Sequence, residues 1–400
     1  MKIAHVTIYP ERAQKHIKAS GVASYTKNLI TAMPATDDEV YILCNKTGAA
    51  PETYTEDGRT VIRCFDRSPN FARQLYAELK RLNPDVIHIQ QELALFGGIA
   101  TAYLLQWLLF ALRKKHVVIT LHGVVSLRKI NKEFVAENNS SLPPQAVKLA
   151  FKRIYKPLTR YARHIIVHEQ VFKDTLIEEY GVPADKISVV YHGVEAFTPL
   201  PRNEACQQLG LDAKKDLALF MGYLSGYKGI GLLIEGFAKY AKTNPNAFLV
   251  IGAGKHPKLY NDEKYLQGYH ALQAKAEALI PAGQYKWIGF IDEKEVGQYY
   301  SAADVSVYPY TVAMSSSGPM SFAMGYEKPF LGSEVFAPIF PQCPELFFER
   351  TPEALAAKLD EFFSNRQRFE KISKTLKQER LWQTVAAQTH DVYKELARES

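Results

Sequence analysis

Residues 217–229 read Leu-Ala-Leu-Phe-Met-Gly-Tyr-Leu-Ser-Gly-Tyr-Lys-Gly, and this stretch is the most informative part of the chain. An apolar run ends at Gly222, a turn follows, and Lys228 precedes a helical pattern over Ile230–Tyr240. A strand that turns tightly into a helix leaves free backbone N–H groups at the helix start, and these groups attract phosphate. A lysine beside them adds positive charge without fixed planar geometry. The stretch predicts a phosphate-binding turn, with a surface lysine after an ordinary turn as the alternative.

Short apolar runs alternate with helical patterns through the first half of the chain. Such runs are typical of buried parallel strands, and their alternation with helices builds a doubly wound parallel sheet. The predicted strands are Ile3–Thr7, Val40–Cys44, Val61–Phe65, Val86–Gln90, Val117–His122, Ile165–His168 and Ile187–Tyr191. The predicted helices include Tyr25–Met33, Phe71–Leu82, Leu149–Tyr161 and Val171–Tyr180.

The alternation pauses at residues 197–203, where Pro199 and Pro201 make a stiff, exposed connector. After Pro352 the chain reads as helix, over Glu353–Phe363 and again from Arg366 to the end. We therefore expect two α/β domains joined by a short hinge, with a ligand cleft between them. The predicted strands of the second half are Leu217–Met221, Phe248–Ile251, Trp287–Phe290, Val305–Tyr308 and Phe330–Leu331.

The composition is that of a soluble globular protein. The 400 residues are 47% hydrophobic and 23% charged, which suits two domains. A net charge of +7 favours anionic partners, but no arginine-rich or aromatic-plus-basic tract predicts binding to nucleic acid. The four cysteines lie far apart without metal-ligand spacing, and no long apolar leader follows Met1. We expect a cytoplasmic protein with reduced cysteines.

Two segments raise the question of membrane contact. Residues Ile99–Leu112 are almost wholly apolar, but these 14 residues fall short of the roughly 20 that span a bilayer. A helix buried on most sides is favoured over one that dips into the membrane. Basic residues also recur along one predicted helix, where a solvated face is favoured over peripheral contact with an anionic membrane. They are Lys148, Lys152, Arg153, Lys156, Arg160 and Arg163.

Small residues stand at three further points where a ligand can approach the backbone. Gly21 lies in a predicted loop before a helix, and Gly254 follows a predicted strand. Ser316, Ser317 and Gly318 lie between a predicted strand and a short helical run, where hydroxyls and N–H groups form an anion nest. A plain loop glycine, a tight turn and a capped helix without ligand are the alternatives.

His122 ends a predicted strand and is followed by a glycine. A histidine there can orient a substrate hydroxyl or stabilise developing charge, although histidines at strand ends are also structural. His88, His168 and His192 stand at similar places, so placement alone does not single out one of them. The chain has no D-x-D pair, H-E-x-x-H, G-x-S-x-G or P-loop pattern, which disfavours metal-dependent hydrolysis and P-loop chemistry.

Taken together, these segments resemble the GT-B glycosyltransferases of family 4, the group 1 retaining nucleotide-sugar transferases, over nearly the whole chain. Trp382 and Tyr393 stand where the last helix of that family returns to its N-terminal domain. Tyr223 replaces the family's usual arginine, Gln90 replaces the second histidine of its H-x-H strand, and residues 312–320 lack its E-x7-E acids. The matching motifs are SGVASY at 20–25, PDVIHIQ at 84–90, TLHG at 120–123, YHGVE at 191–195, the turn at 222–229, VIGAG at 250–254 and ADVSVYP at 303–309.

The resemblance implies two facing Rossmann-like domains with a cleft between them, at residues 1–196 and 204–376, with a helix over 377–400 packing back on the first. It implies a retaining, metal-independent hexosyltransferase that needs no cofactor. The donor would be a nucleoside diphosphate sugar. The acceptor would be a hydroxyl of a glycan, a glycolipid or a small molecule, in bacterial glycan or glycolipid synthesis.

The resemblance also assigns roles to individual residues. Lys228 and His122 would be catalytic, and no residue would hold a metal. Because the family's acids are missing, a catalytically silent GT-B subunit that binds glycan or a partner enzyme is one alternative. A GT-B sugar phosphorylase or epimerase is a second. The donor-binding residues would be Gly21, Tyr223, Gly254, Ser316, Ser317 and Gly318.

Overall fold

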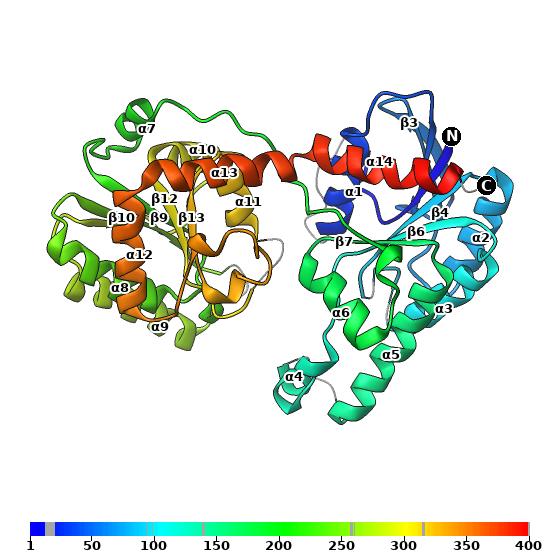
Figure 1. Cartoon of the computed structure of the whole chain (residues 1–400), viewed down its shortest axis with the longest axis horizontal. Coiled ribbons are helices and arrows are strands. Elements are labelled where there is room, and N and C mark those ends of the chain that lie inside the picture. The colour runs from blue at the N-terminus through cyan, green and yellow to red at the C-terminus, as the bar shows by residue number, and fades with distance from the viewer. Residues whose placement is uncertain are drawn as a thin grey trace. The chain divides into compact units, whose positions relative to one another are not determined.

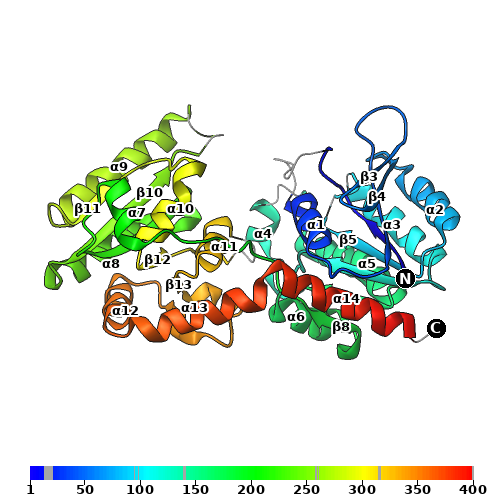
Figure 2. The same ribbon diagram turned by 90° about the horizontal axis from the view of Figure 1, so that it is seen from above.

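The computed structural model divides the chain into two compact units, each with its own parallel sheet (Figure 1, Figure 2). The first unit contains Met1–Gly193 and Trp382–Ser400, and the second contains Val194–Leu381. The structure describes residues 1–12, 21–93, 95–97, 99–137, 141–256, 259, 261–313 and 317–398. Ser316 of the predicted donor site lies outside the described residues.

The sheet of the first unit has the strand order β3-β4-β2-β1-β5-β6-β7-β8. Its centre is β1, which pairs in parallel with β2 on one side and β5 on the other. The strands β5 to β8 follow in sequence order and are also parallel, so their carboxyl ends meet at one edge. The bounds are β1 Lys2–Val6, β2 Glu39–Asn45, β3 Glu52–Glu56, β4 Arg59–Phe65, β5 Val86–Gln91, β6 His116–Leu121, β7 His164–Val167 and β8 Ile187–Val189.

The β3–β4 hairpin departs from the fully parallel sheet that the sequence predicts, because these two strands pair antiparallel. Asp57 and Gly58 between them both have positive φ, 49° and 75°. Two consecutive residues of that kind form the tight turn that Asp-Gly favours in hairpins. The strand Glu52–Glu56 is polar and partly exposed, so a search for apolar runs does not find it.

Helices cover both faces of this sheet, and α1 begins earlier than predicted. It starts at Gly21 instead of Tyr25, so Gly21 is the first residue of a helix and not part of a loop. Val22, Thr26 and Leu29 are buried at helical spacing, which explains the early start. The bounds are α1 Gly21–Thr31, α2 Phe71–Leu82, α3 Ile99–Ala111, α4 Lys132–Glu137, α5 Pro144–Tyr161, α6 Gln170–Tyr180 and α14 Trp382–Arg398.

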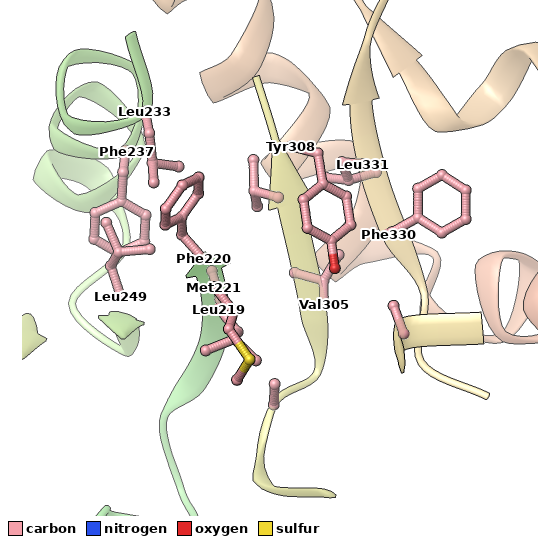
Figure 3. Close-up of a cluster of buried hydrophobic side chains, with 14 of the residues drawn as sticks. Leu219, Phe220, Met221, Leu233, Phe237, Leu249, Val305, Tyr308, Phe330 and Leu331 are labelled. Carbon is pink, nitrogen blue, oxygen red and sulfur yellow. The ribbon is translucent and has the colours of Figure 1, made fainter. Parts of the chain in front are cut away.

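The sheet of the second unit has the order β11-β10-β9-β12-β13-β14, and its described pairings are parallel. Figure 3 shows part of its core, where Phe220 of β9 lies beside Phe237 of α8, and Tyr308 of β12 lies nearer to β13. The strands are β9 Asp216–Tyr223, β10 Ala247–Gly254, β11 Tyr285–Trp287, β12 Val305–Tyr308, β13 Phe330–Ser333 and β14 Phe347–Phe348. The helices are α7 Arg202–Leu209, α8 Ile230–Thr243, α9 Glu263–Leu279, α10 Glu293–Ala302, α11 Gly318–Gly325, α12 Pro352–Ser364 and α13 Arg366–Arg380.

The boundary between the units differs by a few residues from the sequence prediction of 1–196, 204–376 and 377–400. Residues 194–196 and 377–381 belong to the second unit. Val194 N–H donates to the carbonyl of Arg380 at 2.7 Å, which ties these two segments together. The helix that belongs to the first unit is α14, which begins at Trp382, where the indole ring packs against Tyr25 with centroids 5.2 Å apart.

Candidate functional site

A pocket of about 390 Å³ lies in the second unit. It is found where β9 and β10 end and α11 begins, the edge at which open α/β sheets bind ligands. Four residues predicted to serve the donor site, Tyr223, Lys228, Gly254 and Gly318, lie around this one pocket. Its lining also includes Gly222 and Phe290.

Lys228 is the cation that lines this pocket, and Glu293 lines it as well. It ends a short 3-10 turn, Gly226–Lys228, just before α8, and its side chain is only 7% exposed. Its Nζ lies 6.0 Å and 5.8 Å from the ring centroids of Tyr227 and Tyr310, and no described carboxylate pairs with it. Burial without such a partner lowers the pKa of Lys228 to about 8. The ammonium is therefore placed where an anion would stabilise it.

Gly222 makes room for this ammonium. Its φ of 144° lies in a region that residues with a side chain rarely adopt, and a Cβ built there would overlap Lys228 Nζ. The apolar run of β9 thus ends in a glycine for a steric reason, not only because the chain turns.

We expect Gly222→Ala to displace the lysine and to strain the backbone. The unfavourable φ should lower the free energy of unfolding by about 1–3 kcal/mol. Because the lysine side chain is flexible, it would move away from its position in the pocket. The free energy of binding a nucleoside diphosphate should therefore fall by more than the free energy of unfolding. Calorimetric titration and thermal unfolding measure the two effects. Gly226→Ala is the matched control, since a Cβ there meets nothing within 4 Å; equal losses in both variants would contradict the assignment.

Tyr223 and Phe290 form a stacked aromatic pair in the lining of the pocket. Their rings stack with centroids 5.9 Å apart and an interplanar angle of 19°, and the two side chains are 39% and 62% exposed. Gly254 allows this arrangement, because a Cβ there would lie 3.1 Å from the Phe290 ring. The sequence places Phe290 inside a strand, Trp287–Phe290, which is wrong: β11 ends at Trp287, and Gly289, with φ 81°, turns Phe290 toward the pocket.

The start of α11 closes the pocket from the other side. Ser317 precedes the helix and is 9% exposed, and Gly318 is its first residue. The hydroxyls of Tyr300 and Tyr308 both donate to the carbonyl of Pro319, at 2.7 and 2.8 Å. The helix start is therefore held firmly, with Gly318 in the lining of the pocket.

His122 belongs to a separate cluster in the first unit, at the carboxyl edge of its sheet. It follows β6 directly and is partly exposed. The ring of Tyr25, one turn beyond Gly21 in α1, packs edge-on against it with centroids 4.7 Å apart. The same tyrosine contacts His168 and His192, at 4.9 and 5.2 Å. Gly21 thus begins the helix that covers His122.

A chain of hydrogen bonds runs through this cluster. His168 Nδ1 lies 2.9 Å from the carbonyl of Val190, and His168 Nε2 lies 3.2 Å from His122 Nδ1. Gln90 Oε1 lies 2.9 Å from His122 Nε2, and Gln90 Nε2 lies 3.3 Å from His88 Nε2, which is also 2.7 Å from the hydroxyl of Thr120. His88 Nδ1 is 2.5 Å from the hydroxyl of Tyr393 in α14.

The protonation states of the three histidines in this chain can be deduced from the groups at its ends. Burial lowers the pKa of His122, His168 and His88, so the rings are neutral and each has one N–H. The carbonyl of Val190 only accepts, so His168 donates from Nδ1 and must accept from His122 Nδ1–H. His122 Nε2 must then accept, which requires Gln90 to turn its NH₂ toward it and its oxygen toward His88. With that amide orientation, each imidazole in the chain has its hydrogen bonds and remains neutral.

Gln90, His168 and Phe290 were not predicted as site residues. The signal for Gln90 was available, since His88 and Gln90 are two residues apart in a strand and so face the same side. Predicting His168 as a site residue requires the register of β6 with β7, and predicting Phe290 requires the turn at Gly289. Among the described residues, no group of three or more His, Cys, Asp and Glu is placed to hold a metal ion.

Two family models together match most of the chain. The model described as "Glycosyltransferase Family 4" matches residues 19–196, and "Glycosyl transferases group 1" matches residues 201–379. A curated relative is the alpha-monoglucosyldiacylglycerol synthase of Acholeplasma laidlawii. It is 23% identical over 304 residues, which are 72% of this chain and 70% of the relative.

Solved structures share the fold over the whole length. The sucrose-phosphate synthase of Thermosynechococcus elongatus superposes with a TM-score of 0.66 at 19% identity, covering 100% of both chains. The HepE protein of Anabaena, solved in complex with UDP, gives a TM-score of 0.66 at 16% identity, covering 99% of this chain and 100% of that one. At these identities the likeness establishes the GT-B fold.

Proposed function

Because the chain belongs to the group 1 glycosyltransferases of the GT-B fold, which transfer a sugar from a nucleotide sugar, we propose that its donor is a nucleoside diphosphate sugar. We propose further that transfer to an acceptor hydroxyl proceeds without a metal ion and keeps the anomeric configuration. The HepE structures, with UDP in one and UDP-glucose in another, support this donor class.

The observation that carries the proposal is the buried ammonium of Lys228, which faces a pocket and pairs with no described carboxylate. As the bond between sugar and diphosphate stretches, negative charge grows on the leaving phosphate. Lys228 and the N–H of Gly318 would meet that charge in a site with little water, where such contacts act most strongly. A fixed cation in this position supplies the charge that a metal ion would otherwise provide.

His122 contributes a neutral ring on the acceptor side. Its two nitrogens are engaged by His168 and Gln90, so it is held in one orientation and in one tautomer. Positive charge develops on the sugar as the leaving group departs, and a neutral imidazole does not oppose that charge. We assign His122 to contact with the sugar and the acceptor, with Gln90 and His168 as residues that position it.

The test is a panel of nucleoside diphosphate sugars mixed with the protein and with alcohol or glycan acceptors. Released nucleoside diphosphate is measured with and without a chelator, and the product anomer is identified by NMR. We expect nucleoside diphosphate to be released in the presence of the chelator as well, and the product to have the same anomeric configuration as the donor sugar. Release that requires a divalent cation, or an inverted product, would overturn the corresponding part of the proposal.

The pH dependence of donor binding follows from Lys228. Since its pKa is lowered to about 8, the free protein loses this charge above that pH. Binding a diphosphate favours the charged form, so binding takes up a proton there. We expect affinity for nucleoside diphosphate to be level from pH about 7 to about 8 and to fall by up to about tenfold per pH unit above. Titration calorimetry measures this, and Lys228→Met should remove the slope.

A further inference from the structure

The helix α3 exposes a row of aromatic side chains. Tyr103, Trp107 and Phe110 are 45%, 44% and 47% exposed, and their spacing of four and three residues puts them on one face. Leu105 and Leu109 on the opposite side are fully buried. The sequence predicts a helix buried on most sides, and the aromatic row forms its exposed side. No helix among the described residues has the length and apolar character needed to cross a bilayer.

The segments that form α3 and α5 and the residues just after them carry cations and no carboxylates. Residues 99–115 and 141–163 contain nine Lys and Arg and no Asp or Glu, whereas the rest of the chain has 40 Lys and Arg against 42 Asp and Glu. The chain's net positive charge therefore resides in α3, α5 and the residues just after them. Lys152, Arg153, Lys156, Arg160 and Arg163 are all exposed.

A pocket of about 420 Å³ joins the cations to the aromatic row. Arg113, Arg160, Arg163 and Lys186 line it, with Asp185 as an acidic neighbour. Lys186 is held in place because its Nζ donates to the carbonyl of Thr159 at 2.5 Å. Burial lowers the pKa of Lys186, and the charge of Arg163 lowers it further, as expected of cations gathered without enough counter-charge.

The aromatic row and the pocket form one continuous surface. Arg113, which lines the pocket, lies 4.2 Å from the ring centroid of Phe110, the last aromatic residue of α3. Tyr161, which also lines the pocket, packs edge-on against Phe110 with centroids 5.6 Å apart. Further along, the amide of Gln106 donates to the carbonyl of Arg153 at 2.9 Å, joining α3 to α5 (Figure 1).

We propose that this surface, defined by Tyr103, Trp107, Phe110, Arg113, Arg160 and Arg163, docks on a membrane that contains anionic phospholipid. The aromatic side chains insert at the level of the headgroups, where such rings are most stable, and a lipid phosphate occupies the basic pocket. Charge complementarity selects this occupant, since three arginines and one lysine face a single carboxylate, Asp185, in the pocket, and this excess of positive charge suits a sheet of negative charge. The inference goes beyond the proposed function, because it concerns a surface that does not include the pocket of Lys228.

The position of the surface in the first unit keeps it away from His122. Arg163 and Lys186 directly precede the first residues of β7 and β8, whereas His122 follows the last residue of β6. In a parallel sheet these are opposite edges. Substitutions in the docking surface therefore leave the His122 cluster intact.

The test is flotation of the full chain with lipid vesicles, which needs no donor or acceptor. We expect binding to phosphatidylcholine vesicles that contain about 30% phosphatidylglycerol, little binding to pure phosphatidylcholine, and weakening between about 50 mM and about 500 mM salt. Arg160→Glu with Arg163→Glu, and separately Trp107→Ser with Phe110→Ser, should each lower the partition coefficient about tenfold or more. Circular dichroism and thermal unfolding confirm that each variant is folded.

Matched controls lie in the second unit, where Lys214→Glu with Lys242→Glu makes the same charge change and Leu279→Ser removes an exposed apolar side chain. These controls should bind vesicles like the wild type. Failure of the wild type to float with anionic vesicles would overturn the proposal, as would docking variants that float as well as the controls. Dimerisation in solution that Trp107→Ser with Phe110→Ser abolishes, without vesicle binding, would instead identify an interface between two copies.

Discussion

Replacing Lys228 by methionine should lower kcat/KM with the true donor by about 10²- to 10³-fold, the range seen when one donor to a developing oxyanion is removed. The ammonium is buried and is not engaged by a described carboxylate, so in the reaction its charge is available for the leaving diphosphate. Most of the loss should appear in kcat, because the negative charge is largest in the transition state. Steady-state kinetics with released nucleoside diphosphate as the signal measures both constants.

Loss of structure would not explain such a result. Methionine keeps most of the volume of lysine and removes a charge that is costly to bury, so Lys228→Met should unfold at the same temperature as the wild type or higher. Lys255→Met is the matched control, since Lys255 follows β10 next to Gly254 but is exposed. That variant should keep its kcat/KM within about twofold. Unchanged kinetics in Lys228→Met would end the proposal for this pocket.

Much of the fold could be predicted because buried strands and amphipathic helices leave a regular pattern in the sequence. The helix Phe71–Leu82 and the strand Val305–Tyr308 have the bounds that the pattern predicts. The elements that were missed do not bury an apolar run of their own. The strand Glu52–Glu56 is polar, and the helix Glu263–Leu279 mixes small, polar and aromatic residues without a clear stripe.

The residues of the candidate site also fall into a group that the sequence predicts and a group that it does not. Gly222 and Gly254 lie at strand ends, and Lys228 lies in the turn that follows β9. Because strand ends in a parallel sheet meet at one edge, a local pattern suffices to place these three residues near one another. The arrangement around His122 was not predictable in this way. It depends on which residues of β5, β6 and β7 stand opposite one another, and a single-residue shift in register would break it.

Gln90→Glu should turn the neutral ring of His122 into a cation. The new carboxylate would stand where the Gln90 amide lies 2.9 Å from His122 Nε2, and it can only accept hydrogen bonds. His122 would then donate from Nε2 to the carboxylate and from Nδ1 to His168, which requires both ring protons. An opposite charge at this distance raises a histidine pKa by about 1–3 units, against the lowering that burial causes in the wild type.

The sign of the effect on catalysis follows from the charge of the sugar. A cationic His122 would oppose the positive charge that develops on the sugar in the transition state, so kcat should fall as pH is lowered through the raised pKa of His122. In the wild type the pKa of His122 is lowered, so kcat should not respond to this group near neutral pH. NMR titration of the histidine side chains, together with the pH profile of kcat, separates this effect from a loss of structure.

Gln90→His is the matched control, because an imidazole there can donate to His122 and accept from His88 without adding charge. It also restores the H-x-H pattern that the sequence of β5 resembles. We expect this variant to keep a neutral His122 and a pH profile like that of the wild type. If Gln90→Glu leaves His122 neutral at pH about 6, the hydrogen-bond chain does not control the protonation of this ring, and the positioning role of Gln90 is wrong.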